Sequence, residues 1–183
     1  MKHISVRIVP MTRSHIKACD AIVSASEPWN ALGEQMDFAA ALSRKDRPYD
    51  RAYVCTVENK TAGFIIFTPQ PVFARGGYIR SIGVAPSMRR LGIGGKLLSF
   101  AEKIISGLSP NSYLCVSSFN RKAQAFYKNA GYTMAGKLQD LILPGASEYI
   151  YWKRLMPRTP VRKNAKNKVP LNPVRPRRIR LTG

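Results

Sequence analysis

The chain has 183 residues, of which 45% are hydrophobic, and a formal net charge of +20. This length and composition favour one globular domain, and no apolar run approaches the roughly 18 residues that a membrane span needs. The amino-terminal segment lacks the continuous apolar core of a signal peptide, and the three cysteines share no metal-ligand spacing. We therefore predict a cytoplasmic protein with reduced thiols and no transmembrane segment.

Apolar residues alternate along the chain between the spacing of strands and the spacing of helices. The expected elements in chain order are a strand over 6–11, a helix over about 14–26, a helix over 34–42, two strands around a turn at 58–60, a strand over 77–85, a helix over 93–108, a strand over 112–118, a helix over 120–130, and a hairpin of strands 132–138 and 148–155. Asn120 is expected to cap its helix and Gly131 to end it.

The last residues differ in composition from the rest. Residues 157–183 carry nine Lys or Arg, five prolines, no acid and no aromatic residue. Such a segment buries too little apolar surface to offset the entropy lost on ordering it. We predict a folded domain over 1–156 and a disordered basic tail over 157–183. The tail either keeps the protein soluble or contacts an anionic partner such as RNA, a ribosome or a membrane.

The stretch VAPSMRRLGIGGKLL places Gly92, Gly94 and Gly95 at the start of a predicted helix. It is neither a dinucleotide fingerprint nor a P-loop, because Leu97 stands where the first needs Gly and the second needs Ser or Thr. The N–H groups in the first turn of a helix bind phosphate, and glycines let the backbone approach it closely. We predict a pyrophosphate site of a third kind, with the pattern R-x-x-G-x-G and nearby cations at Arg89, Arg90 and Lys96.

These residues also carry a family resemblance. SIGVAPSMRRLGIGGKLL resembles the acetyl-CoA signature of the GNAT acyltransferase superfamily, Q/R-x-x-G-x-G/A. Downstream, SSFNRKAQAFYKNAGYTMAG is similar to that superfamily's second motif, N-x-x-A-x-x-F-Y-x-x-x-G-[FY]. The resemblance covers about Ser5 to Leu155. It implies a single-domain α/β (α+β) fold with a mixed, mostly antiparallel central sheet, flanked by helices and splayed between its fourth and fifth strands. It also implies acetyl-CoA as the acyl donor.

The resemblance assigns donor-binding residues at the matching positions. The backbone of Ile82, Gly83 and Val84 would pair with the pantetheine arm, where a bulge in the fourth strand opens the sheet. A glycine inside a strand is typical of such a bulge or of close backbone approach. Asn120 would hydrogen-bond the same arm. The pyrophosphate would be held by Arg89, Arg90, Leu91, Gly92, Ile93, Gly94, Gly95 and Lys96.

Two proton transfers accompany acyl transfer to an amine. Tyr127 matches the family's general acid, a phenol that protonates the departing thiolate. The general base is left open, because no acid lies between Gly76 and Gly95. Glu27, beside the segment where relatives shape the acceptor pocket, is our catalytic prediction. The carboxylates that could orient or deprotonate an amine are Glu27, Glu34, Asp140 and Glu148.

The sequence therefore predicts an acyl-CoA-dependent N-acetyltransferase. The acetyl group would pass by direct attack to a primary amine of a protein amino terminus, a lysine or a small molecule. Two alternatives remain: a non-catalytic acyl-CoA-binding module on the same fold, and a ribosome- or nucleic-acid-associated protein that works through its tail. A homodimer also remains open.

Overall fold

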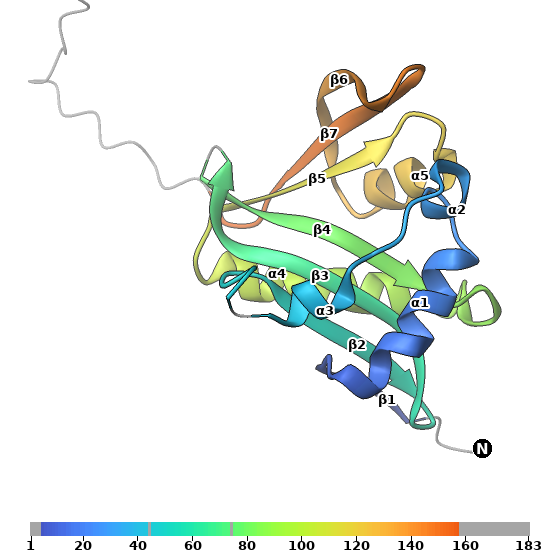
Figure 1. Ribbon diagram of the computed structural model, residues 1–183. Coiled ribbons are helices and arrows are strands. Elements are labelled where there is room, and N and C mark those ends of the chain that lie inside the picture. Colours follow the sequence, from blue (N-terminus) through green and yellow to red (C-terminus); the bar gives the residue numbers. More distant parts are fainter. Residues whose placement is uncertain (1–4, 44, 74, 158–183) are drawn as a thin grey trace, which may run out of the picture.

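A computed structural model describes residues 5–43, 45–73 and 75–157. One sheet runs through these residues in the order β1-β2-β3-β4-β5-β7-β6 (Figure 1). The neighbouring strands are antiparallel except for the pair β4 and β5. The strands are β1 (Val6–Pro10), β2 (Arg51–Val57), β3 (Lys60–Phe73), β4 (Gly76–Val84), β5 (Asn111–Ser117), β6 (Thr133–Leu143) and β7 (Ala146–Arg154). The predicted fold class is confirmed.

Helices cover both faces of the sheet. They are the short 3-10 helices η1 (Arg13–His15) and η2 (Pro86–Met88), and α1 (Ile16–Ser24), α2 (Trp29–Leu32), α3 (Phe38–Leu42), α4 (Ile93–Ser106) and α5 (Arg121–Asn129). In Figure 1, α1 and α3 lie in front of β2 to β4 and α4 lies behind them. Each face therefore has its own apolar core.

The face behind the sheet is filled by α4. Its buried residues Leu97, Ala101 and Ile105 recur at helical spacing and pack in one cluster with Ile65 and Phe67 of β3. Burying a leucine or isoleucine side chain stabilises a fold by about 1.5–3 kcal/mol. This packing fixes the amino-terminal end of α4 against the sheet.

The opposite face is filled by α1 and α3. Cys19 and Ile22 of α1 and Phe38 of α3 pack with Phe64 and Ile66 of β3. Along β3, side chains face α4 and the pair α1 and α3 in turn, because successive side chains of a strand point to opposite sides. β3 is therefore buried on both faces, as its continuous apolar sequence requires.

The predicted helix over 34–42 is wrong in its first half. Gly33 has a left-handed backbone (φ 65°) and ends α2, and the chain becomes helical again only at Phe38. The carboxylate of Asp37 accepts a hydrogen bond from the Ala40 N–H at 2.8 Å and so caps α3. The helix α2 lies between the two predicted helices, in a stretch for which no element was predicted.

The pairing of β4 with β5 stops early. It runs from Gly76 opposite Asn111 to Ile79 opposite Leu114, and beyond that point the described residues of the two strands do not pair. β5 continues along β7 and β4 continues along β3. The sheet therefore opens between β4 and β5, as predicted.

The β-bulge lies at Arg80 rather than at Gly83. Ile66 pairs with Ser81 and Phe67 pairs with Ile79, so Arg80 is the extra residue on β4. Gly83 pairs regularly but has no room for a side chain, because a Cβ there would lie 2.5 Å from a ring carbon of Phe64. Its glycine serves close packing against Phe64.

The other predicted strands and helices are confirmed with shifts of a few residues at their ends. The structure describes no helix that is long and apolar enough to cross a membrane. Residues 158–183 of the predicted basic tail lie outside the described residues.

Candidate active site

The opening between β4 and β5 continues into a cleft of about 690 Å³. Most of the residues predicted to bind acetyl-CoA line this cleft: Ile82, Gly83, Val84, Arg89, Arg90, Gly92, Ile93, Gly94, Gly95 and Asn120. Tyr127 and Glu27, the predicted catalytic residues, also line it, whereas Leu91 and Lys96 do not. The structure thus brings together nearly all of the predicted site.

The glycine segment forms the amino-terminal end of α4. Gly92 adopts a left-handed backbone (φ 75°) as the N-cap residue, and its carbonyl accepts the Lys96 N–H at 3.0 Å. The N–H groups of Ile93, Gly94 and Gly95 precede this first intrahelical bond and are left at the helix end. Such an end carries roughly half a positive charge and suits a phosphate. The Lys96 N–H, in contrast to the prediction, is already used within the helix.

Gly94 faces the cleft next to α5. A Cβ at this position would lie 3.5 Å from the ring of Phe126 and 3.7 Å from Val84, in ordinary contact. Any larger side chain would extend between α4 and α5. A glycine here keeps the space beside the helix end open for a ligand.

Arg89 holds the end of β4 to the segment after α1. Its Nη2 donates to the Ser26 hydroxyl at 2.7 Å, and its Nε donates to the Val84 carbonyl at 3.2 Å. Arg90, which has a positive φ of 66°, is exposed at the cleft. Of the two predicted arginines, Arg90 is the one with a free guanidinium among the residues that the structure describes.

Asn120 is the N-cap of α5, as predicted. Its Oδ1 accepts the Ala123 N–H at 3.1 Å, so its Nδ2 group is left to donate. Across the cleft, the backbone of β4 beyond Ile79 pairs with no strand on its β5 side in the described parts of the chain. A free strand edge and an amide donor suit an extended chain that contains amides, such as pantetheine. The cleft therefore fits acetyl-CoA.

Tyr127 of α5 is buried, with 6% of its surface exposed. Its ring packs edge-on against Phe126 and Tyr132, at centroid distances of 5.0 and 5.7 Å. Burial raises the pKa of its phenol above the ordinary value, so the hydroxyl is protonated at neutral pH. No hydrogen bond to this hydroxyl is recorded from the described residues, which leaves it able to donate to a ligand.

The four candidate carboxylates lie in different settings. Asp140 accepts a hydrogen bond from the Gly145 N–H at 3.0 Å in the β6–β7 turn, and it does not line the cleft. Glu27 and Glu34 line the cleft with exposed side chains. Glu148 of β7 also lines the cleft but is buried.

Glu148 is the carboxylate that the structure singles out. Its Oε1 is fully buried and has no hydrogen-bond partner in the described part of the chain. Burial raises the pKa of this carboxyl above the ordinary value; a hydrogen bond from Ser117 lowers it in part, and the nearby Glu34 raises it further. A buried acceptor without a partner is costly unless a ligand donates to it.

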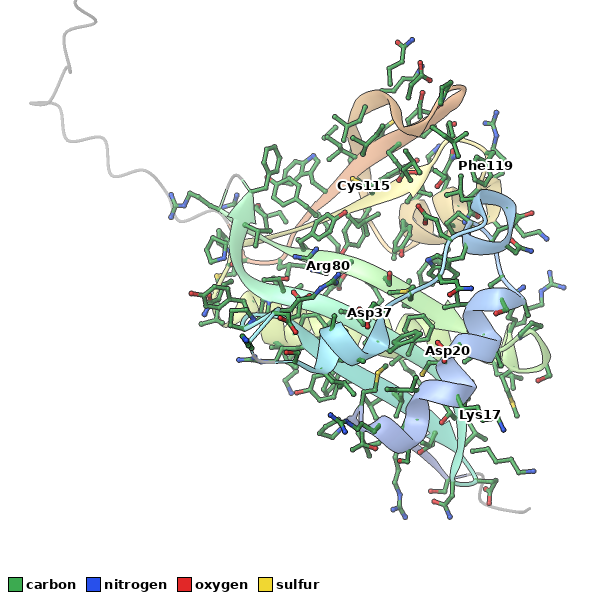
Figure 2. All side chains as sticks on the ribbon, viewed as in Figure 1. Lys17, Asp20, Asp37, Arg80, Cys115 and Phe119 are labelled. Carbon is green, nitrogen blue, oxygen red and sulfur yellow. The ribbon has the colours of Figure 1, made fainter. Side chains whose placement is uncertain are left out.

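The cleft residues that the sequence analysis missed include Tyr78 and Arg80 of β4, and Cys115 of β5. Figure 2 labels Arg80 and Cys115, which lie on the two strands that separate. Burial raises the pKa of the Cys115 thiol, which also hydrogen-bonds Tyr78, so it is not a thiolate at neutral pH. A cation inside the apolar strand GYIRSIGV was the one available signal.

Comparison with known proteins agrees with this geometry. The protein-family model described as "Acetyltransferase (GNAT) family" matches residues 16–132, which is more than half of the chain. This chain belongs to the acetyltransferase (GNAT) family. The predicted family, the acyl-CoA-dependent acyltransferase class and acetyl-CoA as the donor cosubstrate are thereby confirmed.

Solved GNAT structures share the fold. The ribosomal-protein-S18-alanine N-acetyltransferase from Escherichia coli is 17% identical, with a TM-score of 0.68 over 86% of this chain and 98% of its own. Ard1 from Thermoplasma volcanium is 21% identical, with a TM-score of 0.70 over 83% and 99%. An aminoglycoside 6'-N-acetyltransferase complexed with coenzyme A is 18% identical, with a TM-score of 0.65 over 84% and 99%. Curated protein sequences gave no significant match.

A side chain at Gly94 should fill the space that the glycine keeps open at the start of α4. Gly94→Ile places a branched side chain between Phe126 and the helix end, where the cleft is open, so acetyl-CoA binding measured by calorimetry should be lost. The backbone of Gly94 is helical, so the thermal midpoint should change little. Gly107→Ala, at the other end of α4, is the matched control and should bind like the parent. Equal binding by Gly94→Ile and the parent would contradict the assignment.

Proposed function

We propose that the protein transfers an acetyl group from acetyl-CoA directly to a primary amine, with Glu148 as general base and Tyr127 as general acid. The observation that carries this proposal is the buried Oε1 of Glu148, which has no hydrogen-bond partner among the described residues and lies in the cleft that also holds the helix end and Tyr127. A carboxylate oxygen without a protein partner is free to accept a proton from an acceptor.

The donor is held by backbone more than by side chains. The N–H groups at the start of α4 bind the pyrophosphate, and the free edge of β4 after Ile79 and the Nδ2 of Asn120 bind the pantetheine arm. When bound, acetyl-CoA supplies an acetyl thioester. Arg90 adds positive charge near the phosphates, whereas Arg89 orders the Ser26 segment over the cleft.

Glu148 addresses the protonation of the acceptor. An amine with a pKa near 8 requires about 1.4 kcal/mol to become neutral at pH 7, and a lysine amine near 10.4 requires roughly 4.6 kcal/mol. A carboxylate whose pKa is raised by burial lies closer to the working pH and is a better base than an exposed one. Glu148 accepts the ammonium proton, and the neutral amine forms the new C–N bond.

Tyr127 completes the reaction on the other side of the acetyl group. As the C–S bond breaks, its phenol donates a proton to the sulfur, and the second proton lost by the acylated nitrogen returns to the phenolate by way of solvent. Its ring is fixed by Phe126 and Tyr132, so the donor position is set before the reaction. The presence of both an acid and a base disfavours the non-catalytic alternative. A cytoplasmic location, an RNA or ribosome partner for the tail, and a homodimer stay predictions.

Glu148→Gln should lower kcat/KM for a primary amine by about 10²–10⁴-fold, measured by thiol release. The pH profile should also lose the limb on which the parent's activity rises as Glu148 deprotonates. The matched control is Glu27→Gln, which removes an exposed carboxylate from the same cleft and should leave both nearly unchanged. If Glu27→Gln loses activity and Glu148→Gln does not, the base is Glu27.

The same Glu148→Gln variant should be more thermally stable than the parent at pH 7 to 8. Below about pH 4 the carboxyl is protonated in both the folded and the unfolded chain, so the two proteins should melt alike. As pH rises from the ordinary pKa of the unfolded chain to the raised pKa of the folded protein, only the unfolded chain ionises fully, so the parent loses stability that the amide keeps. Lower stability of the variant at pH 8 would instead mark Glu148 as a structural residue.

Tyr127→Phe removes the proton but keeps the ring, so kcat should fall by about 10²–10⁴-fold while acetyl-CoA affinity and thermal stability hold. Tyr132→Phe is the matched control: its hydroxyl donates to Ser112 at 2.9 Å, outside the cleft. That variant should lose about 0.5–1.5 kcal/mol of stability and keep its kcat. An unchanged kcat in Tyr127→Phe, with chemistry rate-limiting, would assign the proton to water.

A further inference from the structure

Arg80 occupies the point where the sheet divides. It is the bulged residue of β4, and it directly follows Ile79, the last residue that pairs with β5. Its side chain is 41% exposed and it lines the cleft. Arg80 has no part in the proposed binding of acetyl-CoA or in the proposed acid–base pair of Tyr127 and Glu148.

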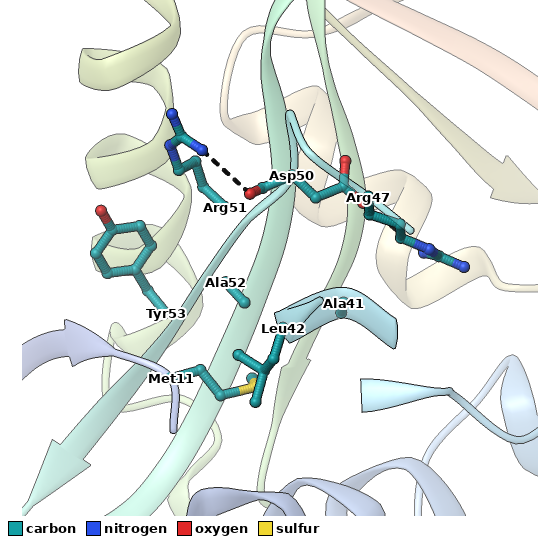
Figure 3. A pocket seen from close by; sticks show the side chains of 8 residues that line it. All are labelled: Met11, Ala41, Leu42, Arg47, Asp50, Arg51, Ala52 and Tyr53. Atoms are coloured by element: carbon teal, nitrogen blue, oxygen red, sulfur yellow. Dashed lines mark hydrogen bonds and ion pairs between the residues drawn. The ribbon is translucent and has the colours of Figure 1, made fainter. Parts of the chain in front are cut away.

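A buried carboxylate holds this arginine by one end. The Nε atom of Arg80 lies 2.9 Å from Oδ1 and 2.9 Å from Oδ2 of Asp50, whose side chain is 3% exposed. The Thr68 hydroxyl donates to the same carboxylate, and Nη1 of Arg47 lies 3.7 Å from Oδ2. Asp50 also borders a separate cavity of about 190 Å³ beside β2 (Figure 3). Burying an aspartate is costly unless it is paired, and here it fixes the direction of Arg80.

The remaining hydrogen-bond donors of Arg80 are its two Nη groups. No hydrogen bond or ion pair to them is recorded from the residues that the structure describes. A guanidinium presents donors in a planar fork that matches a carboxylate. Because Asp50 engages only the Nε atom, the fork remains available in the cleft.

Arg80 lies on β4 before the segment that reaches the helix end, and Asp50 holds its Nε. Val84 contacts the start of α4 near Gly94, at 3.7 Å from the position of a Cβ there. Arg80 precedes Val84 by four residues, which is about 13 Å along a strand. The anion that Arg80 suits must therefore lie at the fork, on the acceptor.

Arg80 faces the same space as Glu148. Both residues line the cleft together with Tyr78. The pKa of the Tyr78 phenol is raised mainly by burial, and in smaller part it is lowered by the positive charge of Arg80 and raised by the negative charge of Glu148. The guanidinium carbon of Arg80 lies 5.8 Å from the centroid of that ring. The cleft thus holds near Tyr78 both an anchored cation, Arg80, and a buried carboxylate oxygen, Oε1 of Glu148, that has no hydrogen-bond partner among the described residues.

We propose that the acceptor is a small amino carboxylic acid, whose carboxylate binds the Nη groups of Arg80 while its amine faces Glu148. This rests on the function proposed above and narrows its substrate class. Asp50 is then a positioning residue that orients Arg80. Amines that carry no carboxylate, such as carboxamides and simple alkylamines, would lack the contact with Arg80.

The test compares glycine, β-alanine and 4-aminobutyrate with their carboxamides, using acetyl-CoA and thiol release. The parent should prefer at least one acid over its amide in kcat/KM, by about tenfold to a hundredfold, the usual effect of a hydrogen-bonded charge pair. Arg80→Gln should abolish this preference by raising KM for the acid, so that the acid and its amide become similar in kcat/KM. Arg80→Lys, which keeps the charge but loses the fork, should retain part of it.

Two controls separate recognition from folding. Asp50→Asn should raise KM for the acid alone, because the fork is less well oriented. Arg47→Gln removes the other arginine beside Asp50, lies outside the cleft, and should keep the preference. Turnover of the amides or of simple amines with no preference for any acid would overturn the assignment, as would an unchanged preference in Arg80→Gln. A panel in which nothing is acetylated would contradict the proposed function instead.

Discussion

The interruption of pairing between β4 and β5 after Ile79 is the constraint on which the site depends. β5 is held by β7 and β4 is held by β3, so each strand stays ordered after they separate. The bulge at Arg80 turns β4 away at this same point. The opening supplies a free strand edge, places the end of α4 beside it, and leaves room for Tyr127 and Glu148. One departure from regular pairing thus creates both the donor and the acceptor parts of the cleft.

The open sheet contains polar groups that a closed sheet would exclude. Asp50 and Glu148 are both buried, and burial of a carboxylate lowers stability unless it is paired. Asp50 has Arg80 and Thr68 as partners, whereas Oε1 of Glu148 has none among the described residues. This oxygen of Glu148 lies in the cleft, where a ligand would enter. The two packed cores on the faces of β3 offset this cost, so the site has a fixed shape without its substrates.

The sequence predicted the parts of this protein that depend on local patterns. The Asn120 cap, the glycines at the start of α4 and the apolar stripe of that helix follow from spacing, and the motif resemblance placed the donor site. The bulge could not be located, because it depends on register with β3. Glu148 could not be chosen over Glu27, since burial follows from how β7 packs. Arg80 and Asp50 were missed because they are 30 residues apart and meet only in the sheet.

Amide hydrogen exchange with and without acetyl-CoA tests the central claim that the opening between β4 and β5 is the acyl-donor site. We expect bound acetyl-CoA to slow exchange at Ile93, Gly94 and Gly95 and along β4 after Ile79. Exchange in β1 and beside the smaller cavity at Arg47 and Asp50 should not change. Protection around that smaller cavity, with none at the start of α4, would contradict the account.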